Sequence, residues 1–127
     1  MKKLKPLLFF GLATLLAGPP ATAGEADVVK VAVRSSSGGV FHFDVTVRHG
    51  DEGWKHYADA FEIVTPGGTV LGTRVLLHPH ETEQPFTRSL RDVQVPAGIT
   101  AVIVRARDKT HGLGGKTMRV ALPGRQK

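Results

Sequence analysis

The stretch from residue 41 to residue 48 alternates strictly between apolar and polar side chains, and this alternation limits what the chain can fold into. Its apolar members are Phe41, Phe43, Val45 and Val47. Successive side chains of a β-strand point to opposite faces, so a period of two predicts a strand with one buried face. No segment of the mature sequence has the 3.6-residue period of an amphipathic helix over a useful length. The pattern therefore favours an all-β domain.

Similar segments recur along the chain, separated by turn signals at intervals of roughly 8 to 12 residues. The expected strands cover residues 27–34, 40–48, 57–64, 69–77, 86–92, 99–107 and 117–122. This arithmetic is typical of a single immunoglobulin-like (fibronectin III-like) β-sandwich of about seven antiparallel strands, and a small barrel is the alternative. We expect Trp54 to cap one end. The expected core comprises Phe41, Phe43, Val45, Val47, Phe61, Ile63, Val75, Leu77, Val102, Val104, Val120 and Leu122.

The first 23 residues have the layout of a secretory signal peptide. Three lysines precede a nearly continuous apolar run over residues 7–18, and Ala21-Thr22-Ala23 supplies an A-x-A cleavage site. The apolar run is too short to span a bilayer. No cysteine is present to carry a lipid, so we expect no membrane anchor. The sequence thus predicts a signal peptide over 1–23 and a periplasmic or secreted domain over 24–127.

Charge and cysteine content exclude several classes of function. The whole chain carries a net charge of +6, but fourteen basic and eleven acidic residues remain after the signal peptide, which leaves +3 with no basic run. Nucleic-acid binding is therefore not expected. The absence of cysteine excludes disulfides, thiolate metal sites and thiol nucleophiles.

Two motifs carry a resemblance to known proteins. Residues 78–86 read HPHETEQPF and residues 111–115 read HGLGG, and both resemble a family of small uncharacterised exported bacterial proteins. Residues 90–106 are similar to the E–F corner and F strand of fibronectin type III-like domains, although no tyrosine stands at that corner. The resemblance implies an exported sandwich, and it implies no activity and no catalytic residues.

Five of the six histidines fall in three loops that this fold would bring together. Successive strands of such a sandwich run in opposite directions, so every second loop lies at the same end. The histidines expected at that end are His49, His56, His78, His80 and His111. The sixth, His42, lies within a strand, and we expect it to take no part in a site.

Several imidazoles at one end of a sandwich suit a divalent late transition metal, Cu(II) or Zn(II). His78 and His80 are the expected central pair, because residues i and i+2 of an extended segment point to the same side. The inclusion of His49 depends on where its strand ends, since a one-residue shift would turn its side chain to the other face. Asp51, Glu52 and Asp108 lie in or beside the same loops, where we expect them to complete the coordination sphere or to hold the second ring nitrogen of a ligand. The expected ligand set is His78, His80, His111, His56, Glu81, Glu83 and His49.

A second class of function competes with metal binding. A non-catalytic module that binds a periplasmic protein or another ligand would also place its contact residues on loops of a rigid sandwich. An enzyme is less favoured, because Ser89 lacks a nucleophile motif and no insertion is long enough to form a cleft. Metal-dependent catalysis would require an open coordination position on the bound ion.

Overall fold

The computed structural model describes residues 25–125, and the expected signal peptide over 1–23 lies outside this part. The described chain is all-β apart from one short 3₁₀ turn, η1 (Gly53–Lys55). The strands are β1 (Asp27–Ser35), β2 (Val40–Arg48), β3 (Ala58–Val64), β4 (Val70–Val75), β5 (Phe86–Gln94), β6 (Ala101–Asp108), β7 (Gly112–Leu113) and β8 (Met118–Ala121). The predicted strands all form. The last expected strand occupies β8, and the two-residue β7 precedes it.

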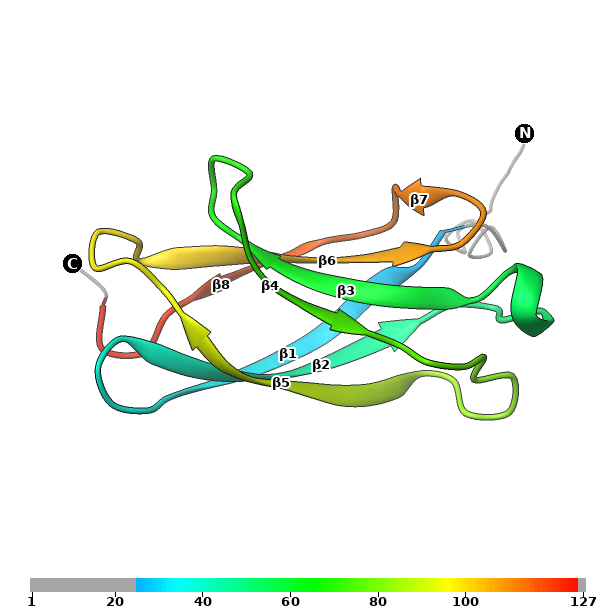
Figure 1. Ribbon diagram of the computed structural model, residues 1–127, viewed down its shortest axis with the longest axis horizontal. Helices are drawn as coiled ribbons and strands as arrows, with labels where there is room; N and C mark the ends of the chain where they lie inside the picture. The colour runs from blue at the N-terminus through cyan, green and yellow to red at the C-terminus, as the bar shows by residue number, and fades with distance from the viewer. Residues whose placement is uncertain (1–24, 126–127) are drawn as a thin grey trace, which may run out of the picture.

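The strands form two antiparallel sheets that pack face to face (Figure 1). One sheet has the order β1-β2-β5. In the other, β4-β3-β6 continues into β7 and β8, which pair with opposite ends of β6. The predicted immunoglobulin-like sandwich is thus confirmed, with β4 placed beside β3 in the sheet opposite β5.

The core lies between the inner faces of the two sheets. The alternation that predicts β2 continues through its whole length, because Phe41, Phe43, Val45 and Val47 are all buried. Phe61, Ile63, Val102, Val104 and Leu122 are buried as predicted, and Val120 packs against this cluster while partly exposed. Burying one such side chain contributes roughly 1.5–3 kcal/mol. The apolar strand faces therefore hold the sandwich together.

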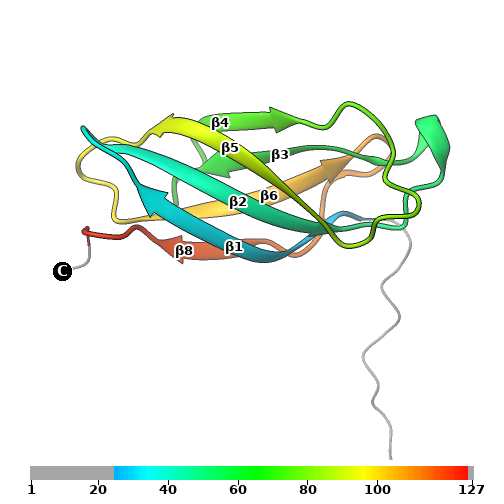
Figure 2. The same cartoon turned by 90° about the horizontal axis from the view of Figure 1, so that it is seen from below.

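Strand β4 faces the opposite way from the prediction. Val75 and Leu77 are 58% and 76% exposed, whereas Leu76 is buried. The inward positions of β4 are Gly72 and Arg74, which pair with the buried Ile63 and Phe61. Figure 2 shows the reason, because β4 runs close beside β5. A side chain at Gly72 would press on Leu90, so a glycine fits there and a large apolar residue does not.

The prediction that Trp54 caps one end is wrong. Trp54 sits in η1, a turn with no buried residue, and is 65% exposed. Its ring packs edge-on against Tyr57, with ring centroids 5.8 Å apart. Tyr57 is the buried member of the pair, so it fills the position that the sequence suggested for the tryptophan.

Candidate metal centre

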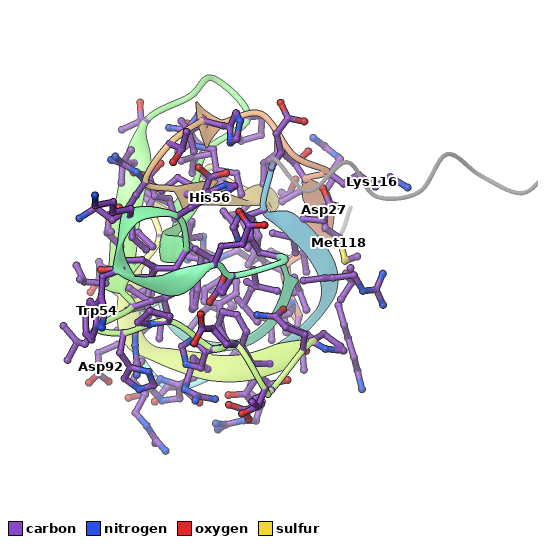
Figure 3. The ribbon with its side chains drawn as sticks, turned by 90° about the vertical axis from the view of Figure 1, so that its right-hand side faces the viewer. Asp27, Trp54, His56, Asp92, Lys116 and Met118 are labelled. Atoms are coloured by element: carbon purple, nitrogen blue, oxygen red, sulfur yellow. The ribbon has the colours of Figure 1, made fainter. Side chains whose placement is uncertain are left out.

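Three loops meet at the end of the sandwich that lies at the right in Figure 1. They join β2 to β3, β4 to β5, and β6 to β8. Figure 3 looks directly onto this end and places Trp54 at its rim. The sequence prediction that five histidines share one end rested on this alternation of loops, and the structure places all five in these loops.

His49 is buried because it continues the inward face of β2. It follows Val45 and Val47 at the same two-residue step, one position beyond the strand end. Its Nδ1 lies 2.6 Å from Oδ1 of Asp51, and its backbone N–H donates to the Gln84 side chain. Its Nε2 lies 3.4 Å from Oδ2 of Asp108 but has no hydrogen-bond partner within residues 25–125.

Asp108 reaches the same place from the opposite sheet. It is the last residue of β6 and continues the buried series Val104 and Ala106. Burial alone would raise the pKa of this carboxyl. The backbone N–H groups of His111 and Thr110, which donate to Oδ1, outweigh that effect together with nearby histidine charge, and the pKa is lowered. Asp108 is therefore an ionised carboxylate in a site with no access to solvent.

His56 and His111 close the solvent side of this carboxylate. The Nε2 atom of His56 lies 3.9 Å from Oδ1 of Asp108, and its Nδ1 lies 3.1 Å from the Glu52 carboxylate. The Nδ1 atom of His111 lies 3.3 Å from Oδ2 of Asp108. The His56 ring centroid is 4.8 Å from that of His49 and 5.0 Å from that of His111. Three imidazoles thus surround one carboxylate.

We call His49, His56, Asp108 and His111 the inner cluster. One ligand atom from each of the first three lies within 4.8 Å of the other two, a spacing that a single ion could bridge. Two of the histidines also have Nδ1 beside a carboxylate, Asp51 for His49 and Glu52 for His56. Such carboxylates orient metal-binding histidines and leave Nε2 to face the ion. His111 is the more exposed member and lies at the outer edge.

The expected central pair stands apart from this cluster. His80 is buried and stacks on Phe86 with ring centroids 3.9 Å apart, while His78 is exposed beside it at 4.5 Å. Neither belongs to the group whose ligand atoms converge with Asp108. Asp51 lies between the two sets, because its Oδ1 contacts His49 and its Oδ2 accepts the His80 backbone N–H.

The two expected glutamates are both exposed. Glu81 lies in the loop between β4 and β5. Glu83 pairs with Arg88 at 3.1 Å, and this hydrogen bond lowers the pKa of the Glu83 carboxyl. His42 lies on β2 and accepts the Asp92 backbone N–H at Nδ1, away from the loop end. These positions leave the inner cluster with Asp108 as its carboxylate.

Sequence reasoning gave Asp108 only a supporting role, although a signal for it was present. Extending the inward alternation of β2 and β6 by one step reaches His49 and Asp108, polar residues at positions where the core would continue. A charged side chain at such a position is rarely buried without a partner. Followed one step past the strand ends, the alternation predicts that His49 and Asp108 are both buried.

Comparison with known proteins shows what this chain is similar to. A protein of Halomicrobium mukohataei named "Putative lipoprotein" is 48% identical over 94 residues, which is 74% of this chain and 46% of the relative. The chain thus spans about half the length of the curated relative that it matches. No family model matches the sequence, and no solved structure matches it. No helix within residues 25–125 is long and apolar enough to cross a membrane.

Proposed function

We propose that this chain is an exported protein that binds a divalent transition metal ion at the inner cluster. Export is supported by the leader-like residues 1–23 and by the relative's printed name, which is that of a lipoprotein. The ligand chemistry supports Cu(II) or Zn(II), because imidazole nitrogens with one carboxylate suit both ions. The chain offers no thiolate, which disfavours Cu(I).

One observation carries the metal proposal: Nε2 of His49 faces the Asp108 carboxylate and has no hydrogen-bond partner within residues 25–125. The Nδ1 atom of His49 lies 2.6 Å from the Asp51 carboxylate, which accepts hydrogen bonds, so Nδ1 carries the proton. In a neutral ring Nε2 is then a bare lone pair, 3.4 Å from a second acceptor. Two buried acceptors that face each other are unfavourable unless a cation lies between them.

A doubly protonated His49 between two aspartates is the other way to satisfy these groups. In that arrangement Nε2–H of His49 would pair with Asp108 at 3.4 Å, although the two groups form no hydrogen bond in the described chain. The metal also explains why His56 and His111 approach the same carboxylate. We therefore favour the metal over the protonated ring.

An interaction module without metal remains the second candidate. Trp54 and Leu77 are large apolar side chains, 65% and 76% exposed, and both belong to loops at this end. Exposed aromatic and aliphatic residues are enriched where proteins bind partners. Metal binding requires the histidines of the inner cluster, whereas an interaction module would not depend on them as ligands.

The test is a titration of dialysed, metal-free protein with Zn(II) and Cu(II). We expect the affinity for the ion to fall by about tenfold or more in His56→Ala and in His111→Ala. Replacing a residue that only hydrogen-bonds a metal ligand already causes a loss of this size, so removing a ligand should cause at least as much. The matched control is His42→Ala, which removes a histidine outside the cluster and should leave the affinity unchanged. Equal small losses in all three variants, or no binding at all, would refute the inner site and favour the interaction module.

A further inference from the structure

The loop between β4 and β5 holds a second pair of histidines that the inner cluster does not use. We call His78 and His80 the outer pair. The His80 side chain is 4% exposed, and neither of its ring nitrogens has a hydrogen-bond partner in the described chain. A buried polar group without a hydrogen-bond partner destabilises the folded state. An imidazole with both nitrogens in this state calls for an explanation.

The surroundings of His80 hold the ring in one orientation. One face stacks on Phe86 with an interplanar angle of 10°. The backbone N–H of His80 donates to Asp51, and its carbonyl oxygen accepts from the Gln84 side chain. The stacking thus holds the ring and the two hydrogen bonds hold the backbone that carries it, while neither ring nitrogen has a hydrogen-bond partner in the described chain. Such preorganisation is expected of a ligand and serves no evident purpose in a packing residue.

His78 places a second imidazole beside His80. Its Nδ1 lies 2.9 Å from the Pro79 carbonyl oxygen, which only accepts, so in the neutral form of the ring Nδ1 carries the proton and Nε2 holds the lone pair. The two rings lie 4.5 Å apart at an angle of 36°. Pro79 fixes the backbone between them, which keeps the rings on one side without further ordering.

The charged groups that act on the outer pair include Arg88, Asp51 and Glu83. Burial lowers the pKa of His80, and the charges of Arg88 and His78 lower it further, against smaller opposite effects of Asp51 and Glu83. Arg88 would repel a cation, but its charge is balanced by the ion pair with Glu83 at 3.1 Å.

We propose that His78 and His80 bind a second divalent transition metal ion, separate from that of the inner cluster. Water would complete the coordination, because the Glu83 carboxylate is paired with Arg88. The Asp51 carboxylate stands between the two sites, since its Oδ2 is 3.9 Å from Nδ1 of His80 while its Oδ1 contacts His49. This site is more open than the inner one, because His78 is exposed. We expect it to bind more weakly.

The experiment counts zinc ions bound by the full exported chain, using calorimetry and equilibrium dialysis. The wild type should bind two. The variant His56→Ala/His111→Ala should keep one, and adding His78→Ala should weaken that remaining ion about tenfold or more. His78 is exposed, so its replacement tests ligation without removing a core side chain, as His80→Ala would. His42→Ala added to the double variant is the matched control and should change nothing.

Copper supplies a second readout, because the nitrogen splitting in its electron paramagnetic resonance spectrum reports bound imidazoles. Copper held by the double variant should show two nitrogen ligands, and His78→Ala should leave one. A single ion that disappears in the double variant would refute the outer site and leave the proposed function intact. A single ion that depends on His78 but not on His56 and His111 would support the outer site and refute the inner one.

Discussion

Asp51 is the residue on which the loop end depends most. Its Oδ1 accepts the Nδ1–H of His49 and the backbone N–H of Ala58, and its Oδ2 accepts the backbone N–H of His80. One buried carboxylate therefore joins the loop after β2, the start of β3 and the loop before β5. The same oxygen that holds His49 also fixes which ring nitrogen faces Asp108. Stability and metal affinity should both respond to its replacement.

We predict that Asp51→Asn lowers the free energy of unfolding by about 2 kcal/mol. The amide replaces one of the two accepting oxygens by an NH₂ group, which cannot accept a hydrogen bond from the N–H groups that now face it. Zinc affinity should fall about 10- to 100-fold, as for other outer-shell partners of metal-bound histidines. Urea unfolding of the metal-free protein and zinc calorimetry measure the two effects. Asp92→Asn is the matched control, since the Asp92 side chain is 82% exposed, and it should stay within about 0.5 kcal/mol of the wild type. An Asp51→Asn variant as stable as this control would contradict the role assigned to Asp51.

Among the elements, the connection from β6 to β8 is rich in glycine but is held in place by contacts with β6 and with the start of β1. Its glycines predict a flexible loop, yet Gly112 and Leu113 pair with the end of β6 as β7. The next residues cross the start of β1, where the Val28 N–H donates to the Lys116 carbonyl oxygen. A Cβ on Gly115 would overlap the Ala26 carbonyl group. Gly115 thus allows a close approach that holds the connection carrying His111 in place.

We predict that Gly115→Ala destabilises the domain by about 1–3 kcal/mol, because the added methyl group forces the backbone of the connection away from β1. Zinc affinity should fall with it, since His111 lies on the same connection. Gly98→Ala is the control, because a Cβ at Gly98 meets no atom within 4 Å. Thermal unfolding compares the two. Equal melting temperatures would show that the connection yields without cost.

The strand positions were predictable from the sequence, while the facing of β4 was not. Alternation and turn residues are local signals, and they locate β2 at the residues where it forms. The inward side of β4 is decided by β5, a strand of the other sheet. Arg74 reaches across to the Ser89 carbonyl oxygen at 2.7 Å, and Gly72 leaves room for Leu90. These contacts join segments that are distant in sequence, so the period of β4 alone points Val75 the wrong way.

For the whole molecule, the sequence predicts the features of the site that depend on local patterns, and it does not predict those that depend on contacts between distant segments. The gathering of five histidines at one end follows from strands that alternate in direction. Which rings converge depends on the two sheets meeting, with His49 from one and Asp108 from the other. The spacing of His78 and His80 predicts that their rings lie together, and they do. It does not reveal that Asp51 separates them from the inner cluster.

The stability of the whole domain should depend on metal and pH together. The pKa of Asp108 is lowered in the folded protein. Its ionised form therefore contributes to the free energy of unfolding at pH values above the ordinary aspartate pKa, and this contribution is lost as the pH falls through the lowered pKa. The pKa of His80 is lowered as well, chiefly by burial. As pH falls below about 6.5, the unfolded chain takes up a proton at this histidine before the folded chain does, which destabilises the metal-free fold.

We predict that zinc at a thousandfold excess over its dissociation constant stabilises the domain by about 4 kcal/mol at pH 7.5, a rise of more than about 10 °C in melting temperature. At pH 5.5 the rise should be much smaller, because protons compete with zinc for imidazole nitrogens while Asp108 stays ionised. The metal-free melting temperature should also fall between these two pH values. Calorimetric scans with zinc and with a chelator measure both effects, and His56→Ala/His111→Ala should lose the part of the rise that the inner cluster supplies. A zinc-dependent rise as large at pH 5.5 as at pH 7.5 would show that carboxylates hold the ion and that the histidines do not.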